Sequence, residues 1–310
     1  MGFAIAGAAL LALALLTVYM SYKAVFGRAA TKRAHSKRAA QKRLFSVPDE
    51  MRRRIDEAAA LPYEAVHTTS HDGLKLAARY YHNADNAPVE VFFHGYRGSP
   101  CGDGYGHLAI CRQLGINALM VDQRSHDNSE GSALSLGINE KLDCAAWARY
   151  CVERFGDDVK LALVGMSMGA GTVLMASDLE LPRNVKGIVA DCGYTSPRDI
   201  VRHVLRAMKL PVGLAYFALS CGARLFGGFD LNGSGAIDAL ARTQLPVLLL
   251  HGERDEFVPC SMSVENYNAA ASRKSLLIVP EARHCGSFLA DEPAYTRAVS
   301  AFMDSIFERR

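Results

Sequence analysis

The sequence lacks the marks of several large classes of protein. Its eight cysteines form no C-x-x-C pair and show no metal-ligand spacing with histidine, so neither a zinc ribbon nor a thioredoxin-like motif is indicated. No repeat with a period of about 20–50 residues is present, which excludes solenoids and propellers. Half of the 310 residues are hydrophobic and 22% are charged, so the chain is typical of a globular protein. Its length suits one large α/β domain.

A basic face of the kind that binds nucleic acid is also missing from most of the chain. Residues 23–54 carry eleven lysines and arginines against Asp49 and Glu50, a formal charge of +9. Residues 1–22 are uncharged and the whole chain has a formal charge of only +3, so the remaining residues carry −6. An acidic body behind a short basic stretch predicts no nucleic-acid partner.

The uncharged amino-terminal segment predicts a membrane anchor. Residues 3–22 contain no charged side chain and have about the length that crosses a bilayer as a helix. A cleaved signal peptide would have a basic n-region and a shorter apolar core, and the myristoylation pattern fails at Ala6. We therefore expect residues 1–22 to form a transmembrane anchor and residues 23–60 to form a basic helical neck.

The charge distribution also predicts how this anchor is oriented. The nearby lysines and arginines all follow it, and the side that carries them should stay cytoplasmic. Cysteines without a disulfide pattern fit the same reducing compartment. The expected location is the cell membrane, with a single span and a cytoplasmic catalytic domain. Because no catalytic motif lies in residues 1–45, a chain without them is expected to be soluble and active.

Short apolar runs alternate with helical patterns through residues 61–310. The runs predict strands at 89–95, 117–124, 160–165, 185–193, 245–252 and 274–280. The helical patterns cover 105–114, 139–155, 168–180, 261–272 and 293–308. Residues 66–82 alternate around Asp72 and Gly73 as in a β-hairpin. This order predicts an α/β domain with a mostly parallel central sheet and helices on both faces.

One connection is much longer than the others. Residues 194–243 separate two predicted strands, whereas connections in compact domains have about 4–6 residues. Within it, residues 210–226 are apolar with a single arginine, but they are too short and too interrupted by glycine for a second span. We expect residues 194–243 to form a helical lid insertion over the strand ends.

The segment VKLALVGMSMGAGTVLMAS at 159–177 predicts a nucleophile. A buried strand leads into G-M-S-M-G and directly into a helix, which is the context of a nucleophile elbow centred on Ser167. Gly165 and Gly169 leave room for the close backbone approach that this turn needs. A serine hydroxyl also needs a neighbouring base to attack at neutral pH.

The partners of such a serine follow it in chain order, first an acid and then a histidine. Asp255 and His284 each follow one of the last two predicted strands, at the sheet edge where ligands bind in open α/β folds. Asp191 ends another strand and is the rival acid. His94 and His251 stand in strand-end H-G dipeptides, and we expect them to support turns rather than act as bases.

Acyl transfer also needs two backbone N–H donors for the developing oxyanion. Met168 follows the nucleophile and should supply one, and Tyr96 in the loop 94–100 should supply the other. The sequence predicts neither a metal nor a cofactor. Residues 230–241 imitate a calcium loop, but Ala241 stands where a bidentate glutamate is required.

Six of these segments together resemble a known family. HGYRGSP, VDQRSHDNSEG, GMSMGAGTVLMAS, ADCGYTSP, HGERDEFVP and VPEARHCGS resemble the α/β-hydrolase fold family, in particular its bacterial membrane-anchored members of uncharacterised substrate. The resemblance covers residues 60–308. It implies the α/β-hydrolase fold and a set of roles: Ser167 as nucleophile, Asp255 as acid, His284 as base, and Tyr96 and Met168 as oxyanion donors. Arg97 and Cys285 depart from the pattern and leave the substrate class open.

These observations favour a serine hydrolase that cleaves a small-molecule carboxylic ester or thioester. A lid near a membrane would suit a lipid-like ester. The first alternative is a peptidase or amidase with the same triad. Large peptidases of this superfamily have an extra amino-terminal domain that gates access, and residues 23–60 are too few to form one. The second alternative is an inactive scaffold, which would predict a broken triad.

Overall fold

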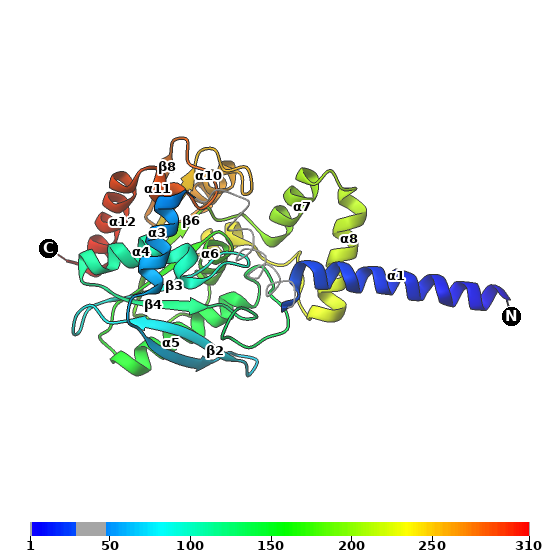
Figure 1. Ribbon diagram of the computed structural model, residues 1–310, viewed down its shortest axis with the longest axis horizontal. Helices are drawn as coiled ribbons and strands as arrows, with labels where there is room; N and C mark the ends of the chain where they lie inside the picture. Colours follow the sequence, from blue (N-terminus) through cyan, green and yellow to red (C-terminus); the bar gives the residue numbers. More distant parts are fainter. Residues whose placement is uncertain (1, 29–47, 310) are drawn as a thin grey trace.

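A computed structural model describes residues 2–28 and 48–309 of the chain (Figure 1). The predicted basic neck is therefore described only at its two ends. Six of its basic residues lie outside the described part, namely Lys32, Arg33, Lys37, Arg38, Lys42 and Arg43.

An eight-stranded sheet forms the centre of the domain. Its strands are β1 (Glu64–Thr69), β2 (Lys75–Tyr81), β3 (Val89–Phe93), β4 (Asn117–Asp122), β5 (Leu161–Met166), β6 (Val185–Asp191), β7 (Val247–Gly252) and β8 (Lys274–Val279). They lie in the order β1-β2-β4-β3-β5-β6-β7-β8. β2 runs antiparallel to both of its neighbours, and all other pairs are parallel. The predicted α/β fold with a mostly parallel sheet is confirmed.

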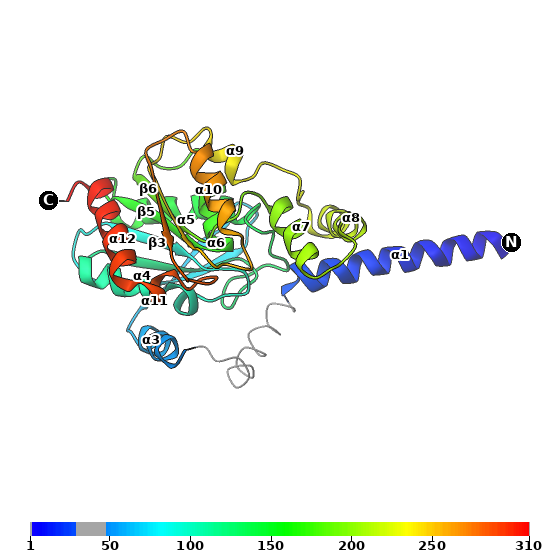
Figure 2. The same ribbon diagram turned by 90° about the horizontal axis from the view of Figure 1, so that it is seen from above.

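Helices cover both faces of this sheet, as predicted (Figure 2). One face packs against α5 (Glu140–Phe155), α6 (Met168–Ala176), α9 (Ala236–Leu240) and α10 (Cys260–Ala269). The other face packs against α3 (Asp49–Ala59), α4 (Pro100–Leu114), α11 (Ser287–Ala290) and α12 (Glu292–Phe307). Each face has its own hydrophobic core, the first under α5, α6, α9 and α10 and the second under α3, α4, α11 and α12. In β5, Leu161 and Leu163 belong to the first core and Ala162 and Val164 to the second, because successive strand residues point to opposite faces.

Local signals explain where the helix after β3 begins and ends. The Ser99 hydroxyl accepts a hydrogen bond from the Gly102 N–H, and Pro100 occupies the first helical turn. The helix ends at Gly115, which has a φ of 62° in the left-handed region that glycine adopts most easily. The Ser99 cap thereby fixes where the loop between β3 and α4 ends.

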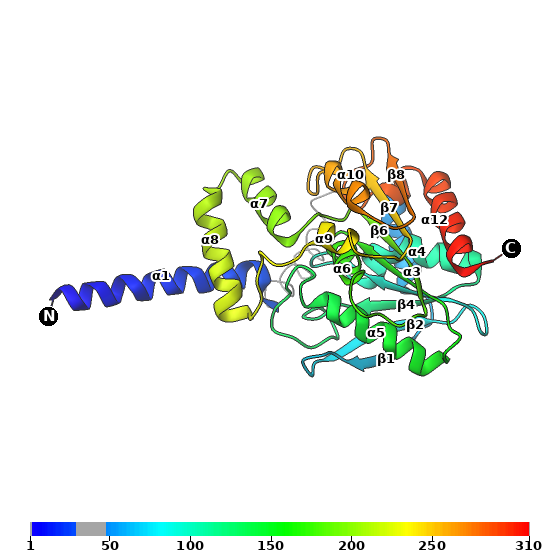
Figure 3. The same ribbon diagram turned by 180° about the vertical axis from the view of Figure 1, so that it is seen from behind.

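The long insertion between β6 and β7 is helical. It contains α7 (Pro197–Ala207), α8 (Val212–Gly222), the π-helix η1 (Ala223–Gly227) and α9. α7 and α8 stand at the side of the domain from which the long amino-terminal helix α1 (Gly2–Phe26) extends, and α8 lies across α1 (Figures 1 and 3).

The end of α1 belongs to the folded body. The helix runs four residues beyond the predicted anchor boundary, and the side chains of Tyr22 and Phe26 are buried in the first core. The Phe26 ring meets the Phe229 ring edge to face at 5.2 Å. Gly27 then forms an antiparallel bridge with Ala133. α1 is the one helix among the described residues that is long and apolar enough to cross a membrane.

Candidate active site

Ser167 occupies a sharp turn between β5 and α6. Its φ of 54° and ψ of −110° are unusual for a residue with a side chain. A β-carbon on Gly165 would overlap the Gly169 carbonyl, and one on Gly169 would overlap the Phe93 carbonyl. The two glycines therefore allow the strand and helix to meet closely enough to present Ser167, as the sequence predicts.

Three predicted site residues are joined by hydrogen bonds. Ser167 Oγ lies 3.0 Å from His284 Nε2, and His284 Nδ1 lies 2.6 Å from Asp255 Oδ2. Because the Asp255 carboxylate accepts, the proton on His284 sits on Nδ1, and Nε2 is left to accept the serine proton. Ser167, Asp255 and His284 follow the parallel strands β5, β7 and β8. The fold therefore brings them together at the carboxyl ends of these strands.

The Asp255 carboxylate is held in its charged form. Burial favours the protonated acid, but hydrogen bonds from His251 and His284 lower the pKa of Asp255 below its usual range. Its other oxygen accepts from the backbone N–H groups of Phe257 and Val258 at 2.9 and 2.8 Å. His251 Nε2 lies 3.3 Å from Asp255 Oδ2, so the histidine expected to support a turn also contacts this carboxylate.

The surroundings of His284 raise its pKa, whereas those of Asp255 lower the pKa of the carboxyl group. Burial favours the neutral ring, whereas the neighbouring Cys192 thiol and the hydrogen bond and negative charge of Asp255 raise the pKa of His284 above its ordinary value. The Phe257 ring packs beside the imidazole at 5.0 Å, tilted by 52°. The ring is therefore held between a charged partner and an apolar wall, and an imidazolium formed during catalysis would be stabilised by Asp255.

Asp191, the alternative acid, has other hydrogen-bond partners than His284. Asp191 accepts hydrogen bonds from the Tyr295 hydroxyl at 3.1 Å and from the Ser287 hydroxyl at 3.3 Å. Burial raises the pKa of Asp191, and its backbone carbonyl accepts the Ser167 N–H at 2.8 Å. Asp191 thus lies behind the serine turn, while Asp255 holds the histidine.

The predicted oxyanion loop lies beside the serine. A β-carbon on Gly95 would come within 3.3 Å of Ser167 Cβ, so the turn that contains Tyr96 passes next to the nucleophile. Met168 is the first residue of α6 and follows Ser167 directly. The Tyr96 hydroxyl does not point at the serine but donates to the carbonyl of Val25 at 2.7 Å.

Sequence reasoning missed Asp103 and His126 among the residues that hold this loop, whereas it expected His94 to support a turn. The Asp103 carboxylate accepts from the Gly95 N–H at 2.8 Å, and His126 Nε2 accepts from the Arg97 N–H at 3.2 Å. His94 Nε2 accepts from the Gln123 N–H at 3.1 Å, so its Nδ1 proton faces the Gly95 carbonyl. The only available signal was position, since His94 follows β3, Gln123 and His126 come after β4, and Asp103 lies in the first turn of α4.

Two groups of described side chains have donor atoms close enough to share a metal ion. Cys192, His284 and Cys285 form one, with the two sulfurs 3.7 Å apart. The second is His71, Asp72 and Asp143, whose carboxylates already pair with the Arg124 guanidinium at 2.9 and 2.6 Å. In the calcium-like loop at 230–241, the carboxylate of Asp230 likewise forms an ion pair, with Arg224 at 2.8 Å. The sequence expectation of no metal remains a prediction.

Comparison with known proteins identifies the family and the fold. The model of the prolyl oligopeptidase family matches residues 115–310. The uncharacterised protein YqkD of Bacillus subtilis is 27% identical over 207 residues, 65% of this chain and 66% of that protein. Lysophosphatidylserine lipase ABHD12 of Danio rerio is 27% identical over 202 residues, 61% of this chain and 49% of that protein.

Solved structures show the same fold. The esterase Pf2001 of Pyrococcus furiosus superposes with a TM-score of 0.67 at 21% identity, over 81% of this chain and 93% of the esterase. The expected α/β-hydrolase fold is therefore confirmed, and the chain is a hydrolase of that superfamily.

Proposed function

The chain belongs to the prolyl oligopeptidase family of α/β-hydrolases, and from this premise we propose that it is a serine hydrolase that cleaves a carboxylic ester or thioester. The observation that carries the proposal is the hydrogen-bonded series from Ser167 through His284 to Asp255. A nucleophile, a base within reach of it and an acid that orients the base are the groups that activate a serine for acyl transfer. This complete series also argues against the inactive scaffold.

In the first half of the reaction, Ser167 Oγ attacks the carbonyl carbon of the ester. His284 Nε2 takes the serine proton as the new bond forms, and Asp255 stabilises the resulting imidazolium. The negative charge moves to the carbonyl oxygen, where we assign the backbone N–H groups of Tyr96 and Met168 as donors. His284 then gives its proton to the leaving alcohol or thiol, and the acyl group stays on Ser167.

In the second half, water replaces the alcohol. His284 Nε2 removes a proton from the water as its oxygen attacks the acyl carbon, and the same proton then returns to Ser167 Oγ. The carboxylic acid leaves and the free serine is restored. No step requires a metal or a cofactor.

A peptidase or amidase is the second candidate, and the family description favours it. The named neighbours favour the ester, because Pf2001 is an esterase and ABHD12 is a lysophosphatidylserine lipase. Both substrates would use the same three residues. We place the ester first because a lipid-like ester also suits a chain with an apolar amino-terminal helix.

We further propose that α1 anchors the enzyme in the cell membrane. Its apolar stretch Ala6–Phe26 is 21 residues long, enough for one span. Lys23, Arg28 and the basic residues that follow should keep the catalytic domain on the cytoplasmic side. Protease added to intact cells should then leave the domain uncut, and cleavage of the domain would contradict this orientation.

Fluorophosphonate labelling tests the activity. The full chain should be labelled, and Ser167→Ala should lose both labelling and turnover, by about 10⁴–10⁶-fold. A matched control is Ser177→Ala, because Ser177 is a buried serine directly after α6 whose hydroxyl has no hydrogen-bond partner among the described residues. p-Nitrophenyl esters of increasing chain length should be cleaved, and the matching anilides should show no measurable turnover. Measurable anilide cleavage would favour the amidase, and a labelled Ser167→Ala chain would remove Ser167 from this role.

A further inference from the structure

Helix α8 has an apolar face on the outside of the molecule. Leu214, Phe217 and Leu225 are 71%, 65% and 64% exposed, which is unusual for large apolar side chains. Their spacing of three and eight residues places them along one side of α8 and η1. The opposite side is buried in the first core through Leu219 and Ala223. No charged residue occurs from Leu210 to Ala223, so this exposed face is not a polar surface.

The exposed face continues onto α1. The rings of Tyr19 and Phe226 meet edge to face at 5.1 Å, and the Tyr22 hydroxyl donates to the Phe226 carbonyl at 3.2 Å. A β-carbon on Gly222 would come within 2.8 Å of Tyr22 Cβ, so the small residue lets the two helices touch. Leu16 and Met20 on α1 are themselves 54% and 58% exposed. One apolar surface therefore runs from the middle of α1 across to α8 and η1.

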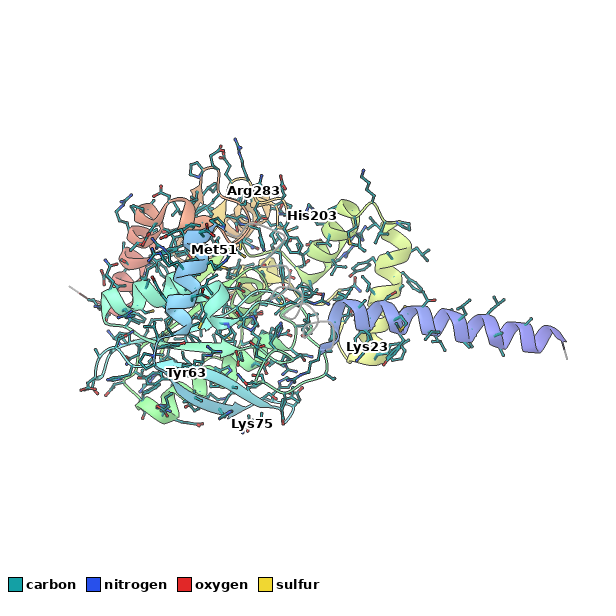
Figure 4. All side chains as sticks on the ribbon, viewed as in Figure 1. Lys23, Met51, Tyr63, Lys75, His203 and Arg283 are labelled. Atoms are coloured by element: carbon teal, nitrogen blue, oxygen red, sulfur yellow. The ribbon has the colours of Figure 1, made fainter. Side chains whose placement is uncertain are left out.

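Positive charge borders this apolar surface. Residues 198–209 contain four basic residues and one acidic residue, and Arg206 and Lys209 are exposed at the turn that leads into α8. Figure 4 shows His203 on α7 and Lys23 at the end of α1 on the same side of the molecule, away from Tyr63. An apolar helix face next to lysine and arginine is typical of segments that lie in the interface of an anionic bilayer.

We propose that α8 and η1 form a second membrane contact, lying in the headgroup and acyl boundary of an anionic phospholipid bilayer beside α1. The proposal rests on the anchor proposed above and deepens it. The partner is the bilayer itself rather than a protein, because the exposed face is continuous with the apolar face of the anchor helix. We refer to Leu214, Phe217 and Leu225 as the α8 face.

The proposed contact of α8 and η1 with the bilayer also indicates which class of substrate reaches Ser167. The last turn of α1 binds the oxyanion loop, since Ala24 and Val25 accept hydrogen bonds from Arg97 and Tyr96. The α8 face and the loop beside Ser167 are thus joined through one helical turn. An ester whose acyl chain lies in the bilayer would reach the site from this side, so the structure assigns membrane-resident acyl esters as substrates.

Quenching by brominated lipid tests the contact in the full chain. Single tryptophans are introduced by Phe217→Trp on the α8 face, by Leu13→Trp on α1 and by Tyr63→Trp, an exposed aromatic on the opposite side. The native Trp147 is fully buried and contributes the same background to each chain. The proteins are placed in nanodiscs of brominated phosphatidylcholine and phosphatidylglycerol. We expect strong quenching for Leu13→Trp and Phe217→Trp, and none above background for Tyr63→Trp.

The outcomes separate the two proposals. If Leu13→Trp is quenched but Phe217→Trp matches Tyr63→Trp, the anchor stands and the α8 contact is wrong. If Leu13→Trp is not quenched, the anchor fails, and the present inference fails with it. Neither outcome affects the assignment of Ser167, which fluorophosphonate labelling tests separately.

A second measurement tests the substrate class. In Leu214→Ser/Phe217→Ser, the ratio of turnover on a long-chain ester in vesicles to turnover on a soluble acetyl ester should fall about tenfold, because interfacial binding scales with the buried apolar area. Ile278→Ser is the matched control, since Ile278 is also exposed and apolar but lies on β8. A ratio that is unchanged in the double variant, or that falls equally in the control, would overturn the substrate assignment.

Discussion

Two carboxylates follow neighbouring parallel strands, and only one of them contacts the histidine that faces Ser167. Asp255 lies 2.6 Å from His284 Nδ1, whereas Asp191 is bonded to Tyr295 and Ser287. We expect Asp255→Asn to lower kcat by up to about 10⁴-fold, because the amide favours the wrong tautomer of the histidine. Asp191→Asn should cost far less turnover. Steady-state kinetics of both purified variants, with their melting temperatures as folding controls, decide between them, and a larger loss in Asp191→Asn would reverse the assignment.

The titration of His284 gives a second prediction for single residues. His284 must be neutral to accept the serine proton, so kcat/KM should rise with pH and level off once the imidazole is deprotonated. Because Cys192 and Asp255 both raise the pKa of His284, the midpoint of this rise should lie above the ordinary value of about 6.5. In Asp255→Asn the residual activity should have its midpoint at a lower pH. A midpoint that does not move on this substitution would show that Asp255 does not control the histidine.

The residues proposed for catalysis and the residues that hold the proposed oxyanion loop differ in how far the sequence could predict them. Ser167 stands in a motif that requires a particular strand, turn and helix, and Asp255 and His284 follow strands in the expected order. Asp103 and His126 instead act on backbone N–H groups of the oxyanion loop. Many polar side chains can bind a backbone N–H, so no residue pattern identifies the ones that do.

At the scale of elements, the packing of α6 on β3 depends on the absence of a side chain. A β-carbon at Gly169 would overlap the Phe93 carbonyl. The backbones of α6 and β3 are both packed in the core, so neither can easily move away. We expect Gly169→Ala to lower the free energy of unfolding by about 1–3 kcal/mol and to impair turnover. Gly213→Ala is the control, since a β-carbon there meets nothing within 4 Å. Thermal unfolding measures both; equal melting temperatures would mean that the turn tolerates a methyl group.

Elements with strong local patterns were predictable, and contacts between distant elements were not. Each predicted strand of the parallel sheet is present within a few residues of its expected ends, because strands buried on both faces read as apolar runs. The insertion 194–243 was expected to be helical and to lie over the strand ends. Its contact with α1 joins Tyr22 to Phe226, which are 204 positions apart, and neither segment alone indicates the other.

At the scale of the whole molecule, α1 is both a candidate membrane span and part of the catalytic domain. Residues 6–17 are exposed, whereas Tyr22 and Phe26 near its end are only 4% and 0% exposed. The division between an anchor ending at residue 22 and a separate neck therefore does not follow a boundary in the packing. The end of the anchor supports the loop that is proposed to bind the oxyanion.

This arrangement changes what truncation should do. The sequence alone suggests that removing residues 1–45 leaves an active enzyme, but that deletion also removes Phe26, and loss of a fully buried phenylalanine side chain costs about 3–5 kcal/mol. It also removes the carbonyls that hold Tyr96 and Arg97. We expect the chain without residues 1–45 to melt at a lower temperature and to hydrolyse a soluble acetyl ester more slowly than the full chain.

The control is a shorter deletion. A chain without residues 1–17 loses most of the exposed apolar helix but keeps Tyr22 and Phe26 and their contacts with the insertion and the oxyanion loop. It should retain the melting temperature and the acetyl esterase rate of the full chain in detergent. The difference between the two deletions thus measures the contribution of residues 18–45, which include the last turns of α1. Equal stability and equal rates would show that these turns serve only as a tether, and the original expectation for residues 1–45 would then hold.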